Sequence, residues 1–165
     1  MIGALVLALS DRVQAAAAAE APEDGAAAAA LALLAHAPGQ PIEQLRRALG
    51  LSHPGAVRLV DRLVADGLVE RRRAIHDGRA VALHLTAAGD GACGRILGAR
   101  ADALGVALAS LGEDELAAFG DVASKVLRRL VEDVDDAYRA CRLCDPVACT
   151  DCPVAAELEA RAGAE

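Results

Sequence analysis

The chain has 165 residues, a formal net charge of −7 at neutral pH, and a hydrophobic fraction of 55% that includes one Phe, one Tyr and no Trp. The negative charge excludes a protein that is basic over its whole surface, as a general nucleic-acid coat would be. Alanine supplies much of the hydrophobic fraction and buries little area per residue, so a monomer would have a thin core that a second copy could complete. Because Ala, Leu and Arg favour helices, the composition predicts a mostly helical fold.

Residues 1–20, MIGALVLALSDRVQAAAAAE, predict an amphipathic helix. No positive charge precedes the apolar run, as it would in a secretory signal. The larger apolar residues recur at helical spacing: Ile2, Leu5, Val6, Leu9 and Val13. We expect no apolar stretch long enough to cross a bilayer, and therefore a cytoplasmic protein with no membrane partner. The cytoplasm keeps thiols reduced.

Positive charge is concentrated in one part of the chain. Residues 41–86 carry eight arginines and five acidic residues, a net charge of +3, whereas the remainder carries nine basic and nineteen acidic residues, a net charge of −10. Such a basic island in an acidic protein is expected where a single module meets phosphate.

The island begins with two predicted short helices, preceded by a small-residue helix over residues 25–39. Pro41 suits a helix start, and Gly50 ends the first helix. Ser52 then caps a second helix that runs to about Asp66, with Pro54 in its first turn. The predicted buried stripe of this second helix is Val57, Val60, Leu63 and Val64. Two short helices joined by a tight turn predict a helix-turn-helix, whose second helix can enter a major groove.

A β-hairpin is predicted over residues 68–86. Apolar residues alternate with polar or small ones along two strands: Val69, Val81, Leu83 and Leu85. His76, Asp77, Gly78 and Arg79 supply turn chemistry between them. A hairpin that follows a helix-turn-helix is a wing, and an arginine at its tip fits a narrow minor groove.

The stretch LSHPGAVRLVDRLVADGLVERRRAIHDGRAVALHLTAAG resembles the winged-helix core of the MarR family of bacterial transcriptional regulators, and the resemblance covers roughly residues 1–139. It implies a dimer whose two recognition helices and wings grip one pseudo-palindromic DNA site, with residues 52–66 as the binding helix and Asp77 and Arg79 in the wing. It also implies a small aromatic or phenolic effector bound between the dimer helices and the DNA domain. Val57 replaces a hydroxyl residue that the family often has, which removes a hydrogen bond to DNA.

The candidate DNA-binding residues are Ser52, His53, Arg58, Arg62, Arg71, Arg72, Arg73, Asp77 and Arg79. We expect Arg58 to choose bases and Arg72 to contribute overall affinity, because base contacts specify and phosphate contacts position. Two alternatives remain. The three consecutive arginines 71–73 could simply protect a sheet edge, and Arg62 could be tied into ion pairs within its own helix.

The remaining helices predict a dimerisation bundle. Residues 86–110 present a stripe of small residues, and an apolar face follows from Leu116 to Val134. The expected fold class is therefore mostly α with a small β wing: a winged helix-turn-helix domain plus N- and C-terminal helices that form the bundle. The expected domains are an N-terminal dimerisation helix (1–24), the DNA-binding domain (25–86), C-terminal dimerisation helices (87–139) and a cysteine-rich tail (140–165).

Four cysteines form two C-x-x-C pairs in this tail: Cys141, Cys144, Cys149 and Cys152. Each pair can turn two thiolates toward one ion, and four cysteines make a closed zinc site. An iron–sulfur cluster is the second possibility, because a closing Cys-Pro occurs in bacterial ferredoxins. Redox-active disulfides are the third, and unligated thiols, which are liable to oxidation, the last. A closed site would be structural or sensory.

No enzyme is indicated. His36, His53, His76 and His84 are scattered outside any catalytic motif, and Cys93 fits a buried packing residue. The sequence therefore predicts a dimeric regulator that binds specific double-stranded DNA and is modulated by a small ligand or by metal or redox state. The alternative is a metal- or iron–sulfur-binding redox module whose winged helix contacts another protein.

Overall fold

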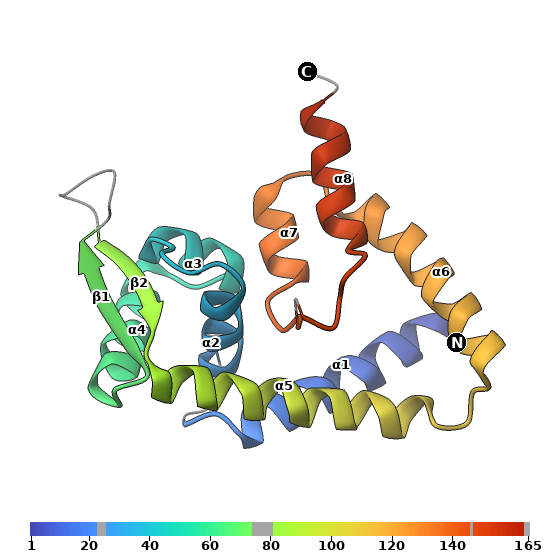
Figure 1. The fold of residues 1–165 in the computed structure, drawn as a ribbon, viewed down its shortest axis with the longest axis horizontal. Helices are drawn as coiled ribbons and strands as arrows, with labels where there is room; N and C mark the ends of the chain where they lie inside the picture. Colours follow the sequence, from blue (N-terminus) through green and yellow to red (C-terminus); the bar gives the residue numbers. More distant parts are fainter. Residues whose placement is uncertain (23–25, 74–80, 146, 164–165) are drawn as a thin grey trace.

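The structure is a computed structural model that describes residues 1–22, 26–73, 81–145 and 147–163. These ranges contain the following elements, arranged as Figure 1 shows: α1 (Ile2–Ala19), α2 (Ala27–His36), α3 (Ile42–Leu49), α4 (His53–Ala65), β1 (Val69–Arg73), β2 (Val81–Leu85), α5 (Ala87–Leu108), α6 (Glu113–Leu130), α7 (Val134–Ala140) and α8 (Pro153–Ala162). The predicted fold class, mostly α with a two-stranded wing, is confirmed.

The reader module, defined here as α2, α3, α4, β1 and β2, lies at one end of α5 (Figure 1). Gly50 adopts a left-handed conformation (φ 64°) that ends α3, and the Ser52 side chain accepts a hydrogen bond from the Gly55 amide at 3.2 Å to begin α4. Both were predicted. The strands pair antiparallel from Val69 opposite Leu85 to Arg73 opposite Val81. The predicted hairpin turn falls on residues 74–80, outside the described residues.

The buried face of α4 differs from the predicted stripe. Ala56, Leu59, Val60 and Leu63 are buried, whereas Val57 and Val64 are half-buried. The core therefore meets α4 about one residue earlier in the helical repeat than expected, because α3 and β1 pack on that side. The strand prediction needs a similar correction, since adjacent Ala82 and Leu83 are both buried while Val81 is exposed.

The longest helix, α5, connects the reader module to the rest of the chain, and α1 packs along it (Figure 1). The Thr86 side chain caps α5 by accepting from the Gly89 amide at 3.1 Å, and also donates to the Gly67 carbonyl at 2.6 Å. Gly89 itself lies against Leu68, where a Cβ atom would stand 2.0 Å from the carbonyl oxygen. The absence of a side chain at Gly89 thus lets α5 pack directly on the chain between α4 and β1.

The apolar face predicted from Leu116 to Val134 is not one continuous helix. The helix α6 ends at Leu130, and Val131 is extended (ψ 110°) and fully buried. Asp133 then starts α7 by accepting a hydrogen bond from the Asp136 amide at 2.8 Å. This cap turns the chain, so that α7 packs on α3 and the following helix α8 packs on α6 and α7.

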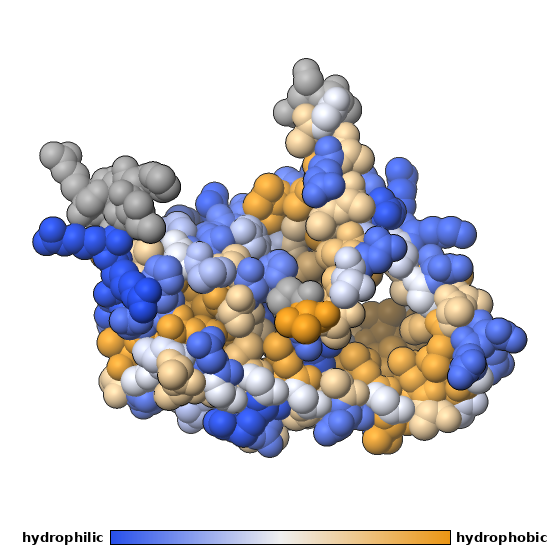
Figure 2. All heavy atoms as spheres, in the orientation of Figure 1, coloured by the Kyte–Doolittle hydropathy of each residue, from blue (hydrophilic) through white to orange (hydrophobic). Residues whose placement is uncertain are grey.

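Large apolar side chains remain exposed on α1 and α6. All residues of α6 are described and none is buried. The exposed set includes Ile2, Leu5, Val6, Leu7, Leu116, Phe119, Val122, Val126 and Leu130. Figure 2 shows apolar atoms around the hollow between these helices, at the end opposite the wing.

The helix α1 corrects one expectation from the sequence. By length and composition it is the one helix among the described residues that is apolar enough to cross a membrane, a test that N-terminal signal sequences and core helices also pass. In this fold α1 packs along α5, and its only buried residue is Ala17.

Replacing Gly89 with Ala should destabilise the protein by about 1–3 kcal/mol, because the added methyl group has no room beside the Leu68 carbonyl. Gly94 lies on the same helix, and a methyl group there would have no neighbour within 4 Å, so Gly94→Ala should stabilise by up to about 1 kcal/mol through helix propensity. Urea unfolding of both variants measures the difference. Equal effects of the two changes would show that α5 does not pack as described.

Candidate functional site

The exposed face of α4 carries the predicted recognition residues. Ser52 and His53 lie at its start, and Arg58 and Arg62 follow four residues apart, so both guanidinium groups are on one face. All four residues are exposed. The Ser52 hydroxyl is already the helix cap, so its first role is to fix the start of α4. Arg62 also interacts within the chain.

The three arginines of β1 do not form one uniform patch. Successive side chains on a strand alternate between faces, so Arg71 and Arg73 share a face and Arg72 lies on the other. Arg71 reaches Asp61 of α4 at 2.6 Å, and Arg72 pairs with its neighbour Glu70. Arg58 and Arg73 make no ion pair or side-chain hydrogen bond with another residue that the structure describes. These two are therefore the arginines most available to a phosphate or a base.

The two predicted wing-tip residues, Asp77 and Arg79, lie outside the described residues. They stay predictions. The strands on either side bring the ends of the wing, Arg73 and Val81, next to each other.

A contact between the C-terminal region and the helix-turn-helix was missed from the sequence. Gln44 of α3 donates to Asp135 at 3.0 Å, and Gln40 donates to the Tyr138 hydroxyl at 2.7 Å. Arg47 lies 3.6 Å from the same Asp135 carboxylate. No local pattern could have found these pairs, because more than 90 residues separate the partners.

A second ion pair lies at the start of α3. Arg46 donates to Glu43, with a closest distance of 2.6 Å. This hydrogen bond lowers the pKa of the Glu43 carboxyl and raises that of Arg46. Both groups stay charged, and the pair is exposed, so it contributes little to stability.

The four tail cysteines line one cavity of about 310 Å³, together with His36, Tyr138 and Leu158. Cys141 is the buried residue that ends α7, and Cys152 precedes the first residue of α8. Cys144 is half-buried and Cys149 exposed, and all are free thiols.

The two C-x-x-C pairs are near one another but do not form a preassembled ligand set. Within the described ranges, no three His, Cys, Asp or Glu side chains form a group that could hold a metal ion as they stand. The interaction between Cys141 and Cys144 lowers the pKa of Cys144 and raises the pKa of Cys141. The pair therefore releases its first proton readily and retains the second.

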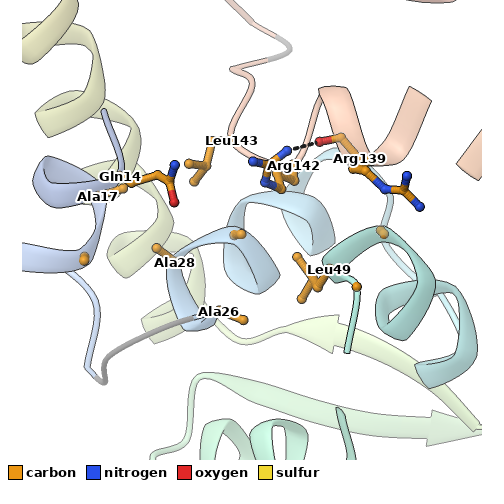
Figure 3. Close-up of a pocket in the computed structure, with 12 residues that line it drawn as sticks. Gln14, Ala17, Ala26, Ala28, Leu49, Arg139, Arg142 and Leu143 are labelled. Atoms are coloured by element: carbon orange, nitrogen blue, oxygen red, sulfur yellow. Dashed lines mark hydrogen bonds between the residues drawn. The ribbon is translucent and has the colours of Figure 1, made fainter. Parts of the chain in front are cut away.

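A larger cavity of about 450 Å³ lies between α1, α2, α3 and the chain after α7 (Figure 3). Half of its lining residues are alanine, and the others include Gln14 of α1, Leu49 of α3, and Arg139, Arg142 and Leu143 near the cysteines. Arg142 donates to the Arg139 carbonyl oxygen, the dashed contact in Figure 3. The Arg139 guanidinium is paired with Asp136, so the cavity combines small apolar walls with the positive charge of Arg142 at one side.

Comparison with known proteins identifies the reader module. The sequence profile of the MarR family matches residues 24–80, less than half of the chain. The matched segment, residues 24–80, is similar to the MarR family and folds here as part of a winged helix-turn-helix.

Solved structures of MarR-family proteins share the fold beyond this segment. The apo form of MarR from E. coli is 26% identical, with a TM-score of 0.61 over 77% of this chain and 97% of that one. The repressor CouR, solved on a 23-mer DNA duplex, is 25% identical, with a TM-score of 0.58 over 76% of this chain and 88% of that one. A MarR family protein from Bacillus stearothermophilus has a TM-score of 0.70 over 79% of this chain and 91% of that one; at 21% identity it shows the fold alone. The search of curated proteins found no match.

Cys93 of α5 was predicted to be a packing residue, and it is buried in the main core. Burial, followed by the nearby Asp90 and Asp145 carboxylates, raises the pKa of Cys93 to about 11. Its thiolate is thus a minor form at about pH 8, near the usual pKa of a cysteine.

In reduced, metal-free native protein, Cys93 should therefore resist brief alkylation at about pH 8. The exposed Cys149 should react before Cys93. Peptide mass spectrometry after iodoacetamide treatment measures both sites, with urea-unfolded protein as the control in which they react alike. Equal modification in the native protein would contradict the burial of Cys93.

Proposed function

We propose that this chain is a sequence-specific transcriptional regulator that binds double-stranded DNA as a homodimer on a pseudo-palindromic site. The observation that carries the proposal is the exposed arginine face of α4, presented by a MarR-family module in the one basic part of an acidic chain. The related repressor CouR was solved on a DNA duplex. Positive charge confined to this module directs the DNA to it and away from the rest of the surface.

The geometry supports a division of roles. With α4 in the major groove, Arg58 is placed to reach base edges. The β1 arginines lie beside α4 and suit phosphates, and Arg79 suits the minor groove at the wing tip. The ion pairs of Arg71 with Asp61 and Arg72 with Glu70 are exposed, so exchanging either carboxylate for a phosphate costs little, at most about 1 kcal/mol.

The exposed apolar residues of α1 and α6 support the homodimer. A monomer rarely leaves so continuous an apolar surface in water, and these helices lie away from the reader module. A two-fold pair of reader modules fits an inverted repeat whose half-sites lie about one helical turn apart.

The cavity in Figure 3 supports a small effector. It lies between the reader module and α1, so a bound molecule would contact both the DNA-binding and the apolar helices. Arg142 in the cavity wall favours a compound with an acidic group. The protein would act in the cytoplasm, associated with the nucleoid when bound to DNA, and without an enzymatic activity.

A different class of function, a redox module whose winged helix contacts a protein, remains the alternative. Its support is the cysteine cavity alone. The salt dependence of the affinity for DNA distinguishes the regulator from the redox module. A protein that neutralises several phosphates loses affinity for DNA steeply as the salt concentration rises.

Replacing Arg58 with Ala should weaken binding of a selected duplex by about 5- to 150-fold, because a base contact by arginine contributes about 1–3 kcal/mol. Fluorescence anisotropy at several salt concentrations measures the loss. Arg161→Ala, which removes a charge from α8 far along the chain, is the matched control and should bind as wild type. A duplex affinity that changes neither with salt concentration nor with the Arg58→Ala substitution would refute the assignment.

Replacing Phe119 with Asp should weaken the homodimer at least about tenfold, because it places a charge where a large apolar side chain is buried between copies. Sedimentation equilibrium measures the monomer–dimer constant. Asp114→Asn, in the first turn of the same helix, serves as the control. A wild-type protein that is monomeric at micromolar concentration would contradict the dimer.

A further inference from the structure

We propose that Cys141, Cys144, Cys149 and Cys152 bind one Zn²⁺ as a closed four-thiolate site that joins the end of α7 to the start of α8. All four side chains line the same cavity of about 310 Å³. Two of them stand at the helix ends themselves, since Cys141 ends α7 and Cys152 precedes α8. A metal ion held by both pairs would therefore fix the angle between the two helices.

The α7–α8 unit needs such a cross-link because its own core is very small. Its buried cluster consists of Val131, Ala137, Cys141 and Val154, with Cys144, Cys152 and Leu158 packed against it. Three of these seven residues are cysteines. Burial of so few and such small side chains cannot offset the entropy of ordering more than 30 residues. Small units of this kind are usually held by a metal or by disulfides.

The arrangement favours a metal over disulfides. Only two residues separate the members of each C-x-x-C pair, Cys141 from Cys144 and Cys149 from Cys152. Oxidation of these neighbours would close two very short loops, which adds little stability and leaves α7 unconnected to α8. One ion bound by both pairs links the helices.

The donor atoms select the metal. Among the described residues that line it, the cavity offers four thiols and no carboxylate. This set suits zinc and disfavours magnesium and calcium, which require oxygen ligands. On binding, each thiol gives up its proton and each sulfur donates a pair of electrons to the ion, with no change of oxidation state. The resulting charge of −2 lies beside Arg100 and Arg142, which line the adjoining hollow with Cys144.

Binding requires a local rearrangement. As the residues stand, no described group of three forms a ligand set, so Cys141, Cys144 and Cys152 must also adjust. Cys149 is the exposed member, and its amide donates to the Asp145 carbonyl oxygen at 3.0 Å. Binding would draw Cys149 inward and bring the two C-x-x-C pairs together around the ion. Zinc would thus complete the fold of the tail.

The test uses the full-length protein, purified with a reductant and without added metal. Elemental analysis should find one zinc per chain, and Cys149→Ser should lose most of it. Cys149 is exposed, so this variant keeps the core intact. Cys93→Ser changes the one cysteine outside the cluster and should keep its zinc. A chelator should lower the midpoint of thermal unfolding of the wild type and of Cys93→Ser, but not of Cys149→Ser.

Three results would overturn the site. The first is a reduced protein that takes up no zinc from a titration, with all four thiols freely reactive. The second is iron with inorganic sulfide in place of zinc. The third is a pair of disulfides, seen as the loss of two hydrogens each in the intact mass. Because zinc content is measured without DNA, none of these results depends on the proposed regulatory function.

Discussion

The fold is constrained throughout by a shortage of large apolar side chains. One Phe, one Tyr and no Trp serve 165 residues, so the core is built by close approach of small ones. The helix α2 buries four alanines and three leucines, and α5 meets the chain before β1 at a glycine, where a methyl group would not fit. Small side chains are enough to form a buried core in the reader module, where five elements pack together. They are not enough around α6, whose 18 described residues include none that is buried. The distribution of burial thus separates a module that is complete in one copy from helices that need another surface.

The positive charge of the chain is concentrated in the reader module, and the rest of the chain is acidic. The reader module holds several of its arginines in exposed ion pairs, such as Arg71 with Asp61 and Arg72 with Glu70. Pairs of this kind contribute little to stability, roughly 0–1 kcal/mol, so they order the side chains without binding them tightly. Arg71 also ties β1 to α4, which places the wing relative to the recognition helix. An acidic ligand elsewhere on the surface would meet net negative charge.

The sequence predicted those features that depend on local chemistry. Gly50, Ser52 and Thr86 mark helix boundaries through backbone freedom and side-chain caps, which act over three or four residues. It failed where the outcome depends on packing. Val57 and Leu59 are both apolar, and only the positions of the elements that pack on α4, namely α3 and β1, decide that Leu59 is buried.

The C-terminal region shows the same limit. The apolar spacing of α6 continues to Val134, and Asp133 alone indicates a new helix start. The contacts of Tyr138 and Asp135 with α3 join partners too distant in sequence for any local pattern. For the candidate sites, the sequence named the arginines and the cysteines. It could not show that Arg71 and Arg72 are paired, or that all four cysteines line one cavity.

The contacts between α7 and α3 set the strength of any communication between the cysteine cavity and the reader module along this route. Cys141 ends α7, and the same short helix carries Tyr138 and Asp135. Their two partly buried hydrogen bonds each contribute about 0.5–1.5 kcal/mol, and the longer approach of Arg47 to Asp135 adds at most about 1 kcal/mol. The sum, on the order of 1–4 kcal/mol, is an upper limit on the coupling carried by these contacts, and it includes the usual range of about 1–3 kcal/mol, a 5- to 150-fold change in affinity. A tail attached in this way is strong enough to adjust the position of α3 and too weak to unfold it.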